Sequence, residues 1–260
     1  MSTTAILFDL DNTLVPEMVS YESAFASATE STVRRLELEP AALRDAVFGA
    51  AAKLWLASPV SAYCLRVGIG SPTSLVSDFP GTGDELAYLR EWASAYRRES
   101  WVSGLEQLGV QDSVNVAAEL DRAFRENLAN HVVPYADALP ALERLGSSYV
   151  LALATNGPAD VQTTKLRASG LERFFPLVVA SSEIGFGKPD PRIFHAALER
   201  MNLPAAEVLV VGDSLEKDVA GAAAAGLRCV WVNRTRARRT SDPAPAFEIE
   251  SLSELHHVLE

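Results

Sequence analysis

After residue 135 the sequence alternates between short apolar runs and longer stretches with amphipathic helical spacing. The short runs are apolar on both faces, which is typical of strands in a parallel sheet that helices cover on both sides. They lie at 149–155, 177–182, 208–213 and 228–233, and an earlier run at 5–9 has the same character. Helices are expected between them, at 137–145, 159–169, 190–201 and 215–225. The alternation predicts an α/β fold built on a doubly wound parallel sheet.

Residues at the ends of these helices support the assignment. Asp190 can cap the helix in "KPDPRIFHAALERM", and Pro191 suits its first turn. Gly226 is expected to end the helix at 215–225. The tail after "TSDPAPAF" predicts a short strand near 247–250 and a last helix at 253–259.

Residues 16–135 follow a different pattern. Four stretches with helical spacing occupy 21–36, 41–57, 84–109 and 112–129, and the Gly-, Pro- and Ser-rich stretch 66–83 predicts a loop. We therefore expect two domains: an α/β core of residues 1–15 and 136–260, and a helical domain of residues 16–135 inserted after the first strand. A proline at each crossing, Pro16 and Pro134, suits a defined hinge better than a loose linker.

The formal net charge of −11 argues against a general binder of nucleic acid or anionic membranes, because both need a basic surface. The one basic cluster, "NRTRARRT" (Asn233 to Thr240), predicts a solvated loop. Cys64 and Cys229 match no metal or redox spacing, and Cys229 suits a small buried position. With no signal peptide and no apolar stretch long enough for a bilayer, we expect a soluble cytoplasmic protein.

Polar residues stand at the carboxyl ends of the predicted strands. The first run ends in Asp9, with Asp11 two residues farther on. The second ends in Thr155 and Asn156, the third in Ser181, Ser182 and Glu183, with Lys188 in the next loop, and the fourth in Asp213. Ligands of open α/β sheets gather at the carboxyl ends of the strands, so these groups can meet in one small volume.

Two carboxylates as close as Asp9 and Asp11 repel each other unless a cation or a shared proton offsets the charge. Together with Asp213 they form a set of hard oxygen ligands that suits Mg²⁺. Lys188 beside that set adds the positive charge that a dianion such as phosphate needs. Taken singly, each acid could cap a helix, Thr155 could close its strand and Lys188 could be a loop lysine.

Four segments in order carry a resemblance to a known family: "DLDNT" (9–13), Thr155 in "LATNG", Lys188 in "GKPDP" and "GDSLEKD" (212–218). They resemble the four motifs of the haloacid dehalogenase superfamily of phosphohydrolases, which have a Rossmann-like core. The helical insertion after the first motif resembles the cap of one branch of that family. The likeness covers nearly the whole chain.

The resemblance implies roles for these residues. Asp9 would attack phosphorus and form an aspartyl-phosphate, and Asp11 would act as general acid and then base while its backbone carbonyl binds Mg²⁺. Thr155 and the amide of Asn156 would hold phosphoryl oxygens, and Lys188 would pair with the nucleophile and the phosphate. By the same resemblance, Asp213 would complete the metal shell, and Asp218 would orient Asp213 or Lys188.

The helical cap would close over the phosphate and contact the leaving group. Candidate contacts are Glu17, Tyr21, Trp55, Tyr63, Arg66, Trp92, Arg97 and Trp101, although most aromatic residues of amphipathic helices belong to the core. The histidines form no ligand set, so we interpret His131, His195, His256 and His257 as structural or solvent-facing.

The leading hypothesis is a Mg²⁺-dependent phosphatase of a small phosphate ester, acting as a monomer or homodimer. Dehalogenases of the family generally lack an acid at the position of Asp11, and phosphonate cleavage needs a cap lysine for which Lys53 is a poor candidate. A phosphosugar mutase keeps both acids and stays open. A non-catalytic alternative is a phospho-acceptor switch or a partner-binding protein.

Overall fold

The computed structural model describes residues 3–239 and 242–259. Six parallel strands form one sheet in the order β3-β2-β1-β4-β5-β6. They are β1 (Ala5–Phe8), β2 (Val150–Thr155), β3 (Leu177–Ala180), β4 (Val208–Gly212), β5 (Arg228–Val232) and β6 (Phe247–Ile249). The central strand β1 lies between β2 and β4, with Leu7 opposite Ala152 and Val210. The predicted doubly wound α/β fold is confirmed.

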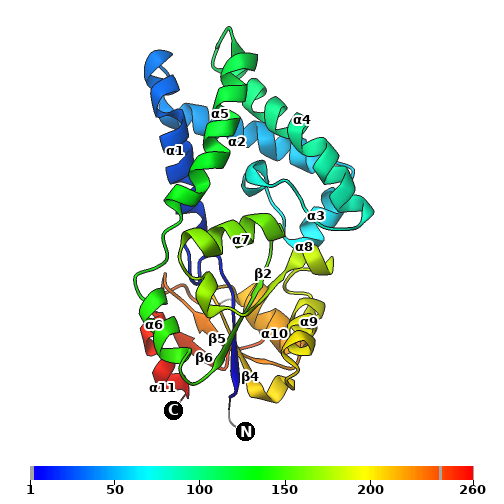
Figure 1. Cartoon of the computed structure of the whole chain (residues 1–260), viewed down its shortest axis with the longest axis vertical. Helices are drawn as coiled ribbons and strands as arrows, with labels where there is room; N and C mark the ends of the chain where they lie inside the picture. Colours follow the sequence, from blue (N-terminus) through cyan, green and yellow to red (C-terminus); the bar gives the residue numbers. More distant parts are fainter. Residues whose placement is uncertain (1–2, 240–241, 260) are drawn as a thin grey trace.

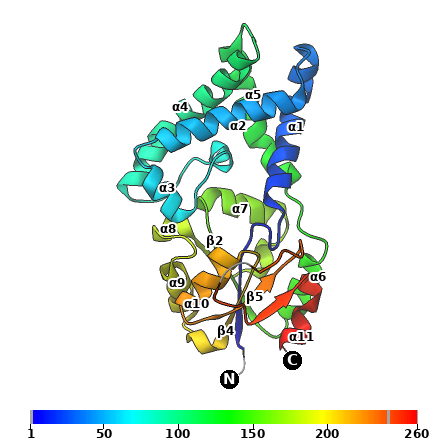
Figure 2. The ribbon, with the colours of Figure 1, turned by 180° about the vertical axis from the view of Figure 1, so that it is seen from behind.

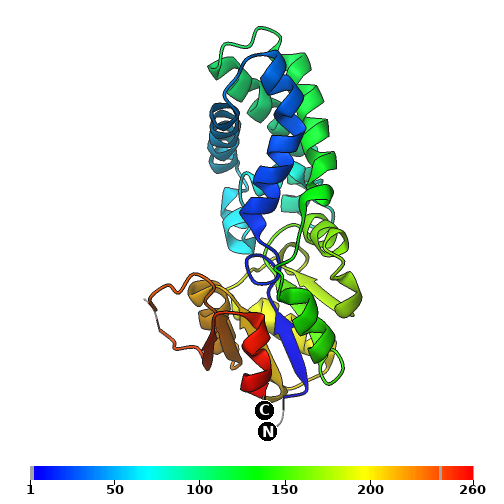
Figure 3. The same cartoon turned by 90° about the vertical axis from the view of Figure 1, so that its left-hand side faces the viewer.

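Alternate residues of the strands face two separate layers of helices. Ile6 and Phe8 belong to the same apolar cluster as α6 (Ala138–Leu145), α7 (Ala159–Ala168) and the terminal helix α11 (Leu255–Leu259). Ala5 and Leu7 pack in a second cluster with α9 (Pro191–Met201) and α10 (Ala220–Ala224). In Figure 1, α6 and α11 lie on one side of the strands and α9 and α10 on the other, and Figure 3 views the core from the side of α6 and α11. Burial on both faces explains why the strands have no polar alternation.

Between β1 and α6 the chain forms the helical insertion, which we call the cap (Figure 1). Its helices are α1 (Glu17–Arg35), α2 (Pro40–Ala57), α3 (Ser61–Val67), α4 (Asp84–Gln107) and α5 (Ser113–Asn127). The first and last described segments of the chain, β1 and α11, belong to the core and not to the cap (Figure 1). In the described residues, no helix combines the length and the apolar character that crossing a membrane requires.

Short helical elements correct three details of the sequence-based assignment. Part of the predicted loop 66–83 is helical, because α3 extends to Val67 and a 3₁₀ turn spans Thr73–Val76. The third strand ends at Ala180, and the next residues form the short helix α8 (Ser181–Ile184). The helix expected at 215–225 begins with a π-helical turn, Leu215–Val219. Periodicity alone does not resolve elements of one or two turns.

The cap reaches the core through α3, which lies against α8 (Figure 2). The guanidinium Nε of Arg66 donates to the carbonyl of Gly185 at 3.0 Å, and the backbone amide of Gly187 donates to the carbonyl of Arg66 at 2.9 Å. The Tyr63 hydroxyl donates to the carbonyl of Ser182 at 3.4 Å. These contacts hold the cap over the carboxyl ends of the strands.

Candidate active site

A tight turn after β1 presents the two acids of the first motif. The amide of Asp9 still donates to the carbonyl of Val211 in β4, at 2.9 Å. The next residues fold back, with the Asn12 amide donating to the carbonyl of Val15 at 2.6 Å and Asn12 in the left-handed region at φ 63°. Asn tolerates that conformation better than most residues. The turn therefore fixes Asp9 and Asp11 at the carboxyl edge of the sheet.

Asp9 lies in a buried network with one cation. Lys188, only 5% exposed, donates to Asp9 Oδ1 and, at 2.7 Å, to Asp218 Oδ1. The Thr13 hydroxyl donates to Asp9 Oδ2 at 2.9 Å, so both oxygens of Asp9 have partners. Burial lowers the pKa of Lys188, but Asp218 and Asp9 together raise it by more, so the pKa lies above its ordinary value. Lys188 is therefore a fixed positive charge beside Asp9.

The carboxylates of Asp9, Asp213 and Asp218 each place an oxygen within 4.8 Å of the others. Burial raises the pKa of Asp9 to about 8 even though Lys188 lowers it, and Asp218 and Asp213 add to the rise. Burial and Asp218 raise the pKa of Asp213 to about 6. Asp9 and Asp213 thus resist ionisation at a place where three carboxylates face one lysine, and a divalent cation would offset the excess negative charge.

Asp218 is held more firmly than a surface acid would be. Besides its ion pair with Lys188, its Oδ2 accepts from the amide of Ser214 at 3.0 Å. Gly212 leaves the space for it, since a Cβ on Gly212 would lie 2.2 Å from Asp218 Cγ. Asp218 thus touches both Lys188 and the carboxylate cluster, so its position suits an orienting role toward either.

The Asp11 side chain points elsewhere. Its Oδ1 accepts from Lys165 Nζ at 2.7 Å and its Oδ2 accepts from Gln162 Nε2 at 2.9 Å, and both donors lie on α7. The Asp11 carboxylate does not belong to the acidic cluster among the described residues, so its predicted place in a metal shell would rest on its backbone carbonyl.

Sequence reasoning missed Gln162 and Lys165. Both are about 1% exposed, in the same buried stripe of α7 as Val161 and Leu166. Burial lowers the pKa of Lys165, but Asp11, Tyr21 and Glu17 raise it well above its usual range. Polar residues in the apolar stripe of a helix were the available signal, because a lysine is almost never fully buried without a partner.

The second strand contributes Thr155 and Asn156. Gln162 Nε2 also donates to the Thr155 hydroxyl and, at 3.0 Å, to the carbonyl of Asn156. The Asn156 side chain donates to the carbonyl of Lys188 at 2.9 Å and accepts from the Lys188 amide at 2.7 Å. The side chain of Asn156 therefore fixes the loop that carries Lys188.

Ser181, Ser182 and Glu183 do not join this group. The Ser181 hydroxyl accepts from the Gly157 amide at 2.9 Å, and the Ser182 hydroxyl accepts from the Ala159 amide at 3.0 Å. The two serines stabilise the loop before α7. Glu183 forms a partly exposed ion pair with Arg200 at 3.6 Å.

A polar cavity of about 170 Å³ lies where these groups meet. Its lining includes the predicted residues Asp9, Asp11, Thr155, Asn156, Lys188, Asp213 and Asp218, together with Asn12, Glu17, Gly68, Ser214 and Lys217. Five carboxylates therefore face two ammonium groups in a small volume. A phosphate dianion would be repelled from such a cavity unless a cation neutralised part of the charge, and carboxylate oxygens are the ligands that suit Mg²⁺.

The cap contributes little side-chain chemistry to the cavity. Of the eight candidate contacts, Glu17 alone is in the lining within the described part of the chain, and Gly68 brings backbone over Asn156. Trp55 and Trp92 pack against each other and against Tyr96, and Trp101 stacks on Phe25 at 5.2 Å. The remaining candidates, Tyr21, Tyr63, Arg66 and Arg97, contact protein groups instead, at Thr73, Ser182, Gly185 and Ser77.

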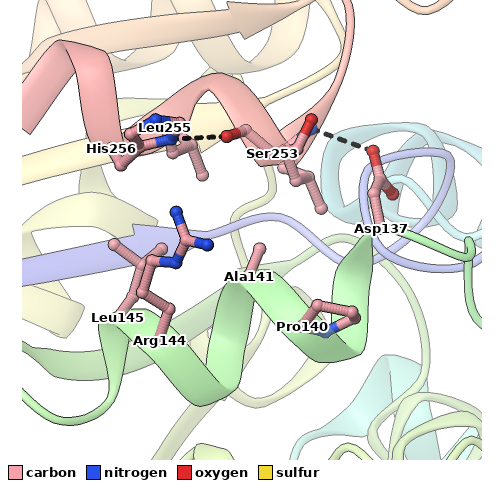
Figure 4. A pocket seen from close by; sticks show the side chains of 9 residues that line it. Asp137, Pro140, Ala141, Arg144, Leu145, Ser253, Leu255 and His256 are labelled. Carbon is pink, nitrogen blue, oxygen red and sulfur yellow. Dashed lines mark hydrogen bonds between the residues drawn. The ribbon is translucent and has the colours of Figure 1, made fainter.

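A second cavity, of about 190 Å³, lies at the other end of the core between α6 and the C-terminal residues. Figure 4 shows Arg144 and Leu145 of α6 opposite Leu255 and His256. Asp137 at its edge is already bound by Arg234 at 2.9 Å, by the Ser251 hydroxyl and by the Leu252 amide. Because protein groups already bind the Asp137 carboxylate, we interpret this cavity as a packing gap between helices.

The basic loop is less solvated than the sequence suggested. Arg234 binds Asp137 and donates to the carbonyl of Thr13 at 2.9 Å, so it ties the loop to the first motif. Arg236 pairs with Glu250 at the surface, and Thr240 lies outside the described residues. The histidines lie outside the lining of the polar cavity around Asp9, and both cysteines are buried and free.

The comparisons with known proteins agree with this geometry. A family model described as haloacid dehalogenase-like hydrolase matches residues 3–226. The chain belongs to the haloacid dehalogenase-like hydrolases. The hydrolase is 33% identical over 251 residues to the phosphoserine phosphatase of Thermus thermophilus, a match that spans 96% of both proteins.

Two further matches show the range of chemistry around this hydrolase. It is 34% identical over 164 residues to the pyrimidine 5'-nucleotidase YjjG of Escherichia coli. This match covers 63% of this chain and 69% of that protein. A crystal structure of 2-haloacid dehalogenase from Pseudomonas syringae has a TM-score of 0.64 and 27% identity, and covers 99% of this chain and 98% of that one. The family resemblance expected from the motifs is confirmed.

Proposed function

We propose that this hydrolase is a Mg²⁺-dependent phosphomonoesterase that acts on a small phosphorylated metabolite. One observation carries the proposal: Asp9, Lys188 and Thr155 line a single cavity, with Asp11 two residues from Asp9. A nucleophile, a fixed cation, a hydroxyl donor and a second carboxyl group are the parts that phosphoryl transfer through a covalent intermediate requires.

Asp9 acts as the nucleophile in this mechanism. One of its oxygens forms a bond to phosphorus while the bond between phosphorus and the ester oxygen breaks. Thr13 and Lys188 each hold one oxygen of Asp9, which limits the directions from which the carboxylate can attack. Lys188 also offsets the charge of the incoming phosphoryl oxygens, and Thr155 binds one of them.

Asp11 exchanges the protons. It enters the cycle protonated and gives its proton to the departing alkoxide, which leaves as the alcohol. It then takes a proton from the water that attacks phosphorus, and the bond between phosphorus and Asp9 breaks. Inorganic phosphate leaves, and both carboxyl groups return to their starting states.

Asp9, Asp213 and the backbone carbonyl of Asp11 would hold Mg²⁺, with Asp218 beside them. The fit rests on the acidic cluster and on the pKa of Asp9 and Asp213, which burial chiefly raises and the neighbouring carboxylates raise further. Bound Mg²⁺ supplies positive charge that lets an anionic substrate approach an anionic nucleophile.

The substrate is proposed to be small and polar. The cavity holds about 170 Å³ and its lining includes the charged groups of Glu17 and Lys217. The full-length similarity to a phosphoserine phosphatase makes L-phosphoserine the first compound to try. Short sugar phosphates and nucleotides follow.

The test is release of inorganic phosphate from a panel of esters, with Mg²⁺ and with EDTA. We expect turnover of at least one alkyl ester, loss of turnover in EDTA, and loss of at least about 10³-fold in kcat for Asp9→Asn, in keeping with removal of a nucleophile. Asp190→Asn, at a helix cap outside the cavity, is the matched control and should stay active.

Three results would contradict the proposal. Halide release from 2-haloacids without phosphate release would favour the dehalogenase chemistry of the structural neighbour. Phosphorus NMR that detects phosphoryl transfer within the substrate would favour a mutase. A stable phospho-aspartate without turnover would favour a phospho-acceptor.

A further inference from the structure

The two acids of the first motif differ sharply in their surroundings. Asp9 is bound by Lys188 and Thr13, inside the carboxylate cluster. Asp11 is bound from α7, with Lys165 on one oxygen and Gln162 on the other. The Asp11 carboxylate is therefore held at the cavity wall, and its direction is set by a helix that the four sequence motifs do not include.

Lys165 has contacts on both sides of the boundary between core and cap. Its Nζ lies 2.7 Å from Asp11 Oδ1 in the core and 3.4 Å from Glu17 Oε1 at the start of the cap helix α1. It also lies 5.3 Å from the centre of the Tyr21 ring, one turn farther along α1. Lys165 itself is 1% exposed and lies outside the cavity lining, so it has no direct path to a substrate.

Folding alone gives a weak reason for this lysine. Moving an ammonium group out of water costs several kcal/mol, and a buried ion pair often contributes no more to stability than well-packed apolar residues would. The same stripe of α7 presents Val161 and Leu166 to the core without such a cost. A role in positioning Asp11 accounts for a charge at this place.

We propose that Lys165 is a positioning residue for Asp11, an inference that rests on the proposed function. Lys165 holds the Asp11 carboxylate next to the leaving-group side of the cavity, with Gln162 fixing the second oxygen. When Asp11 turns toward the substrate to exchange a proton, Glu17 remains as a counter-charge for Lys165. Because Glu17 belongs to the cap, this release of Asp11 depends on the cap being seated.

The test compares two substrates in Lys165→Met. 4-Nitrophenyl phosphate has a leaving group that departs without a proton, whereas an alkyl ester such as L-phosphoserine needs one. In rapid mixing, the variant should release 4-nitrophenol in a burst of one equivalent per active site at the wild-type rate, followed by slow turnover. With the alkyl ester we expect no burst and a loss of about 10²-fold or more in kcat, the range for general acid–base catalysis, with KM unchanged.

Two other variants serve as controls. Lys53→Met removes an exposed lysine of α2 and should match the wild type on both substrates. Lys165→Arg keeps the positive charge and should recover part of the activity on the alkyl ester. The burst amplitude counts intact active sites, so a partly unfolded Lys165→Met sample is still informative. If that variant does not fold, the ratio of alkyl to aryl rates in Lys165→Arg, expected to fall below the wild-type ratio, takes its place.

The inference is overturned if Lys165→Met slows the burst and the alkyl reaction equally, or slows neither. It is also overturned if the alkyl ester loses activity through KM alone. Failure of the proposed function would look different, because the wild type would then release phosphate from neither substrate.

Discussion

The core and the cap of this hydrolase use their buried residues for different purposes. The core buries charge: Asp9, Lys165, Lys188 and Asp218 are all at most 6% exposed and are paired with one another or with Asp11. The cap buries one charged side chain in the described residues, Arg97, and otherwise packs rings. One chain of ring contacts joins Phe25, Phe48, Phe124 and Trp101, and a second joins Trp55, Phe79, Tyr88, Trp92 and Tyr96.

This difference matches two roles: the core carries the groups that can react, and the cap forms a stable helical domain above them. Aromatic packing stabilises a small helical domain without needing polar partners, whereas buried charges are costly unless a network satisfies them. The described residues that meet at the cavity come mainly from the core, and the cap adds Glu17 and Gly68. Substitutions in the core should therefore change the rate, and substitutions in the cap should change the stability.

Outside the acids and lysines of the site, the largest expected effect on the rate comes from Gly212, the smallest residue of the fourth motif. In Gly212→Ala, the new Cβ would lie 2.2 Å from Asp218 Cγ, so Asp218 must move and Lys188 loses a partner. A displacement of about 1 Å in such a site can cost about 10²-fold in rate, so we expect a loss of at least that size in kcat. Steady-state kinetics would show it, with circular dichroism as a check of folding. A variant with normal kcat would mean that Asp218 does not orient the site.

The complementary change in the cap is Trp101→Ala. Trp101 is fully buried and stacks on Phe25, and its removal should leave a cavity that lowers the free energy of unfolding by about 3–5 kcal/mol. Activity per folded molecule should stay close to the wild type, since Trp101 does not line the cavity. Urea unfolding and kcat measured on the same sample would decide. A large loss of kcat in folded protein would place Trp101 among the residues that contact substrate.

The acidic cluster predicts that Mg²⁺ binding depends on pH. The pKa of Asp9 is raised to about 8 and that of Asp213 to about 6, chiefly by burial, so both hold protons at lower pH and must release them to bind a metal. Affinity should rise as the pH rises through this range, by up to about tenfold per pH unit for each proton released.

The same shifts affect the metal-free protein. A carboxyl group whose pKa is raised by folding contributes most stability below its ordinary pKa, and this contribution is lost as the pH rises toward the folded value. The metal-free protein should therefore lose stability between the ordinary value of 3.8 and about 8, and Mg²⁺ should raise the Tm more at the upper end. Thermal unfolding with and without Mg²⁺ tests both signs. A rise in Tm with Mg²⁺ that is equal at every pH of the range would contradict them. Asp213→Asn should make the rise in Tm with Mg²⁺ smaller.

The smallest effect is expected where cap and core touch. Arg66 is 44% exposed in its side chain, donates to the carbonyl of Gly185 and lies 5.2 Å from the centre of the Phe186 ring. Because solvent screens an exposed contact, Arg66→Ala should weaken the contact between cap and core by less than about 1 kcal/mol. This corresponds to a loss of less than about tenfold in kcat/KM. A loss confined to KM would fit weaker seating of the cap. A loss in kcat as large as that of Gly212→Ala would put Arg66 in the chemistry.

The sequence was a good guide to the edge of the sheet and a poor one to its surroundings. Asp9, Thr155 and Asp213 stand at the ends of strands whose order along the chain can be read from apolar runs, and their convergence follows from the geometry of parallel strands. Eight cap residues were equally plausible contacts, and Glu17 is the one that lines the cavity within the described residues. Helical spacing identifies a buried face but not what lies opposite it.

The sequence by itself determined the α/β core, the helical insertion and the acids and lysine at the strand ends, because strand alternation and motif order are local properties of the chain. The tertiary structure alone decided that Lys165 meets Asp11 across 154 residues and that Glu17 joins them from the cap. Those contacts depend on how α7 and α1 pack beside the turn after β1. Packing of side chains from distant segments leaves no periodic trace in the sequence.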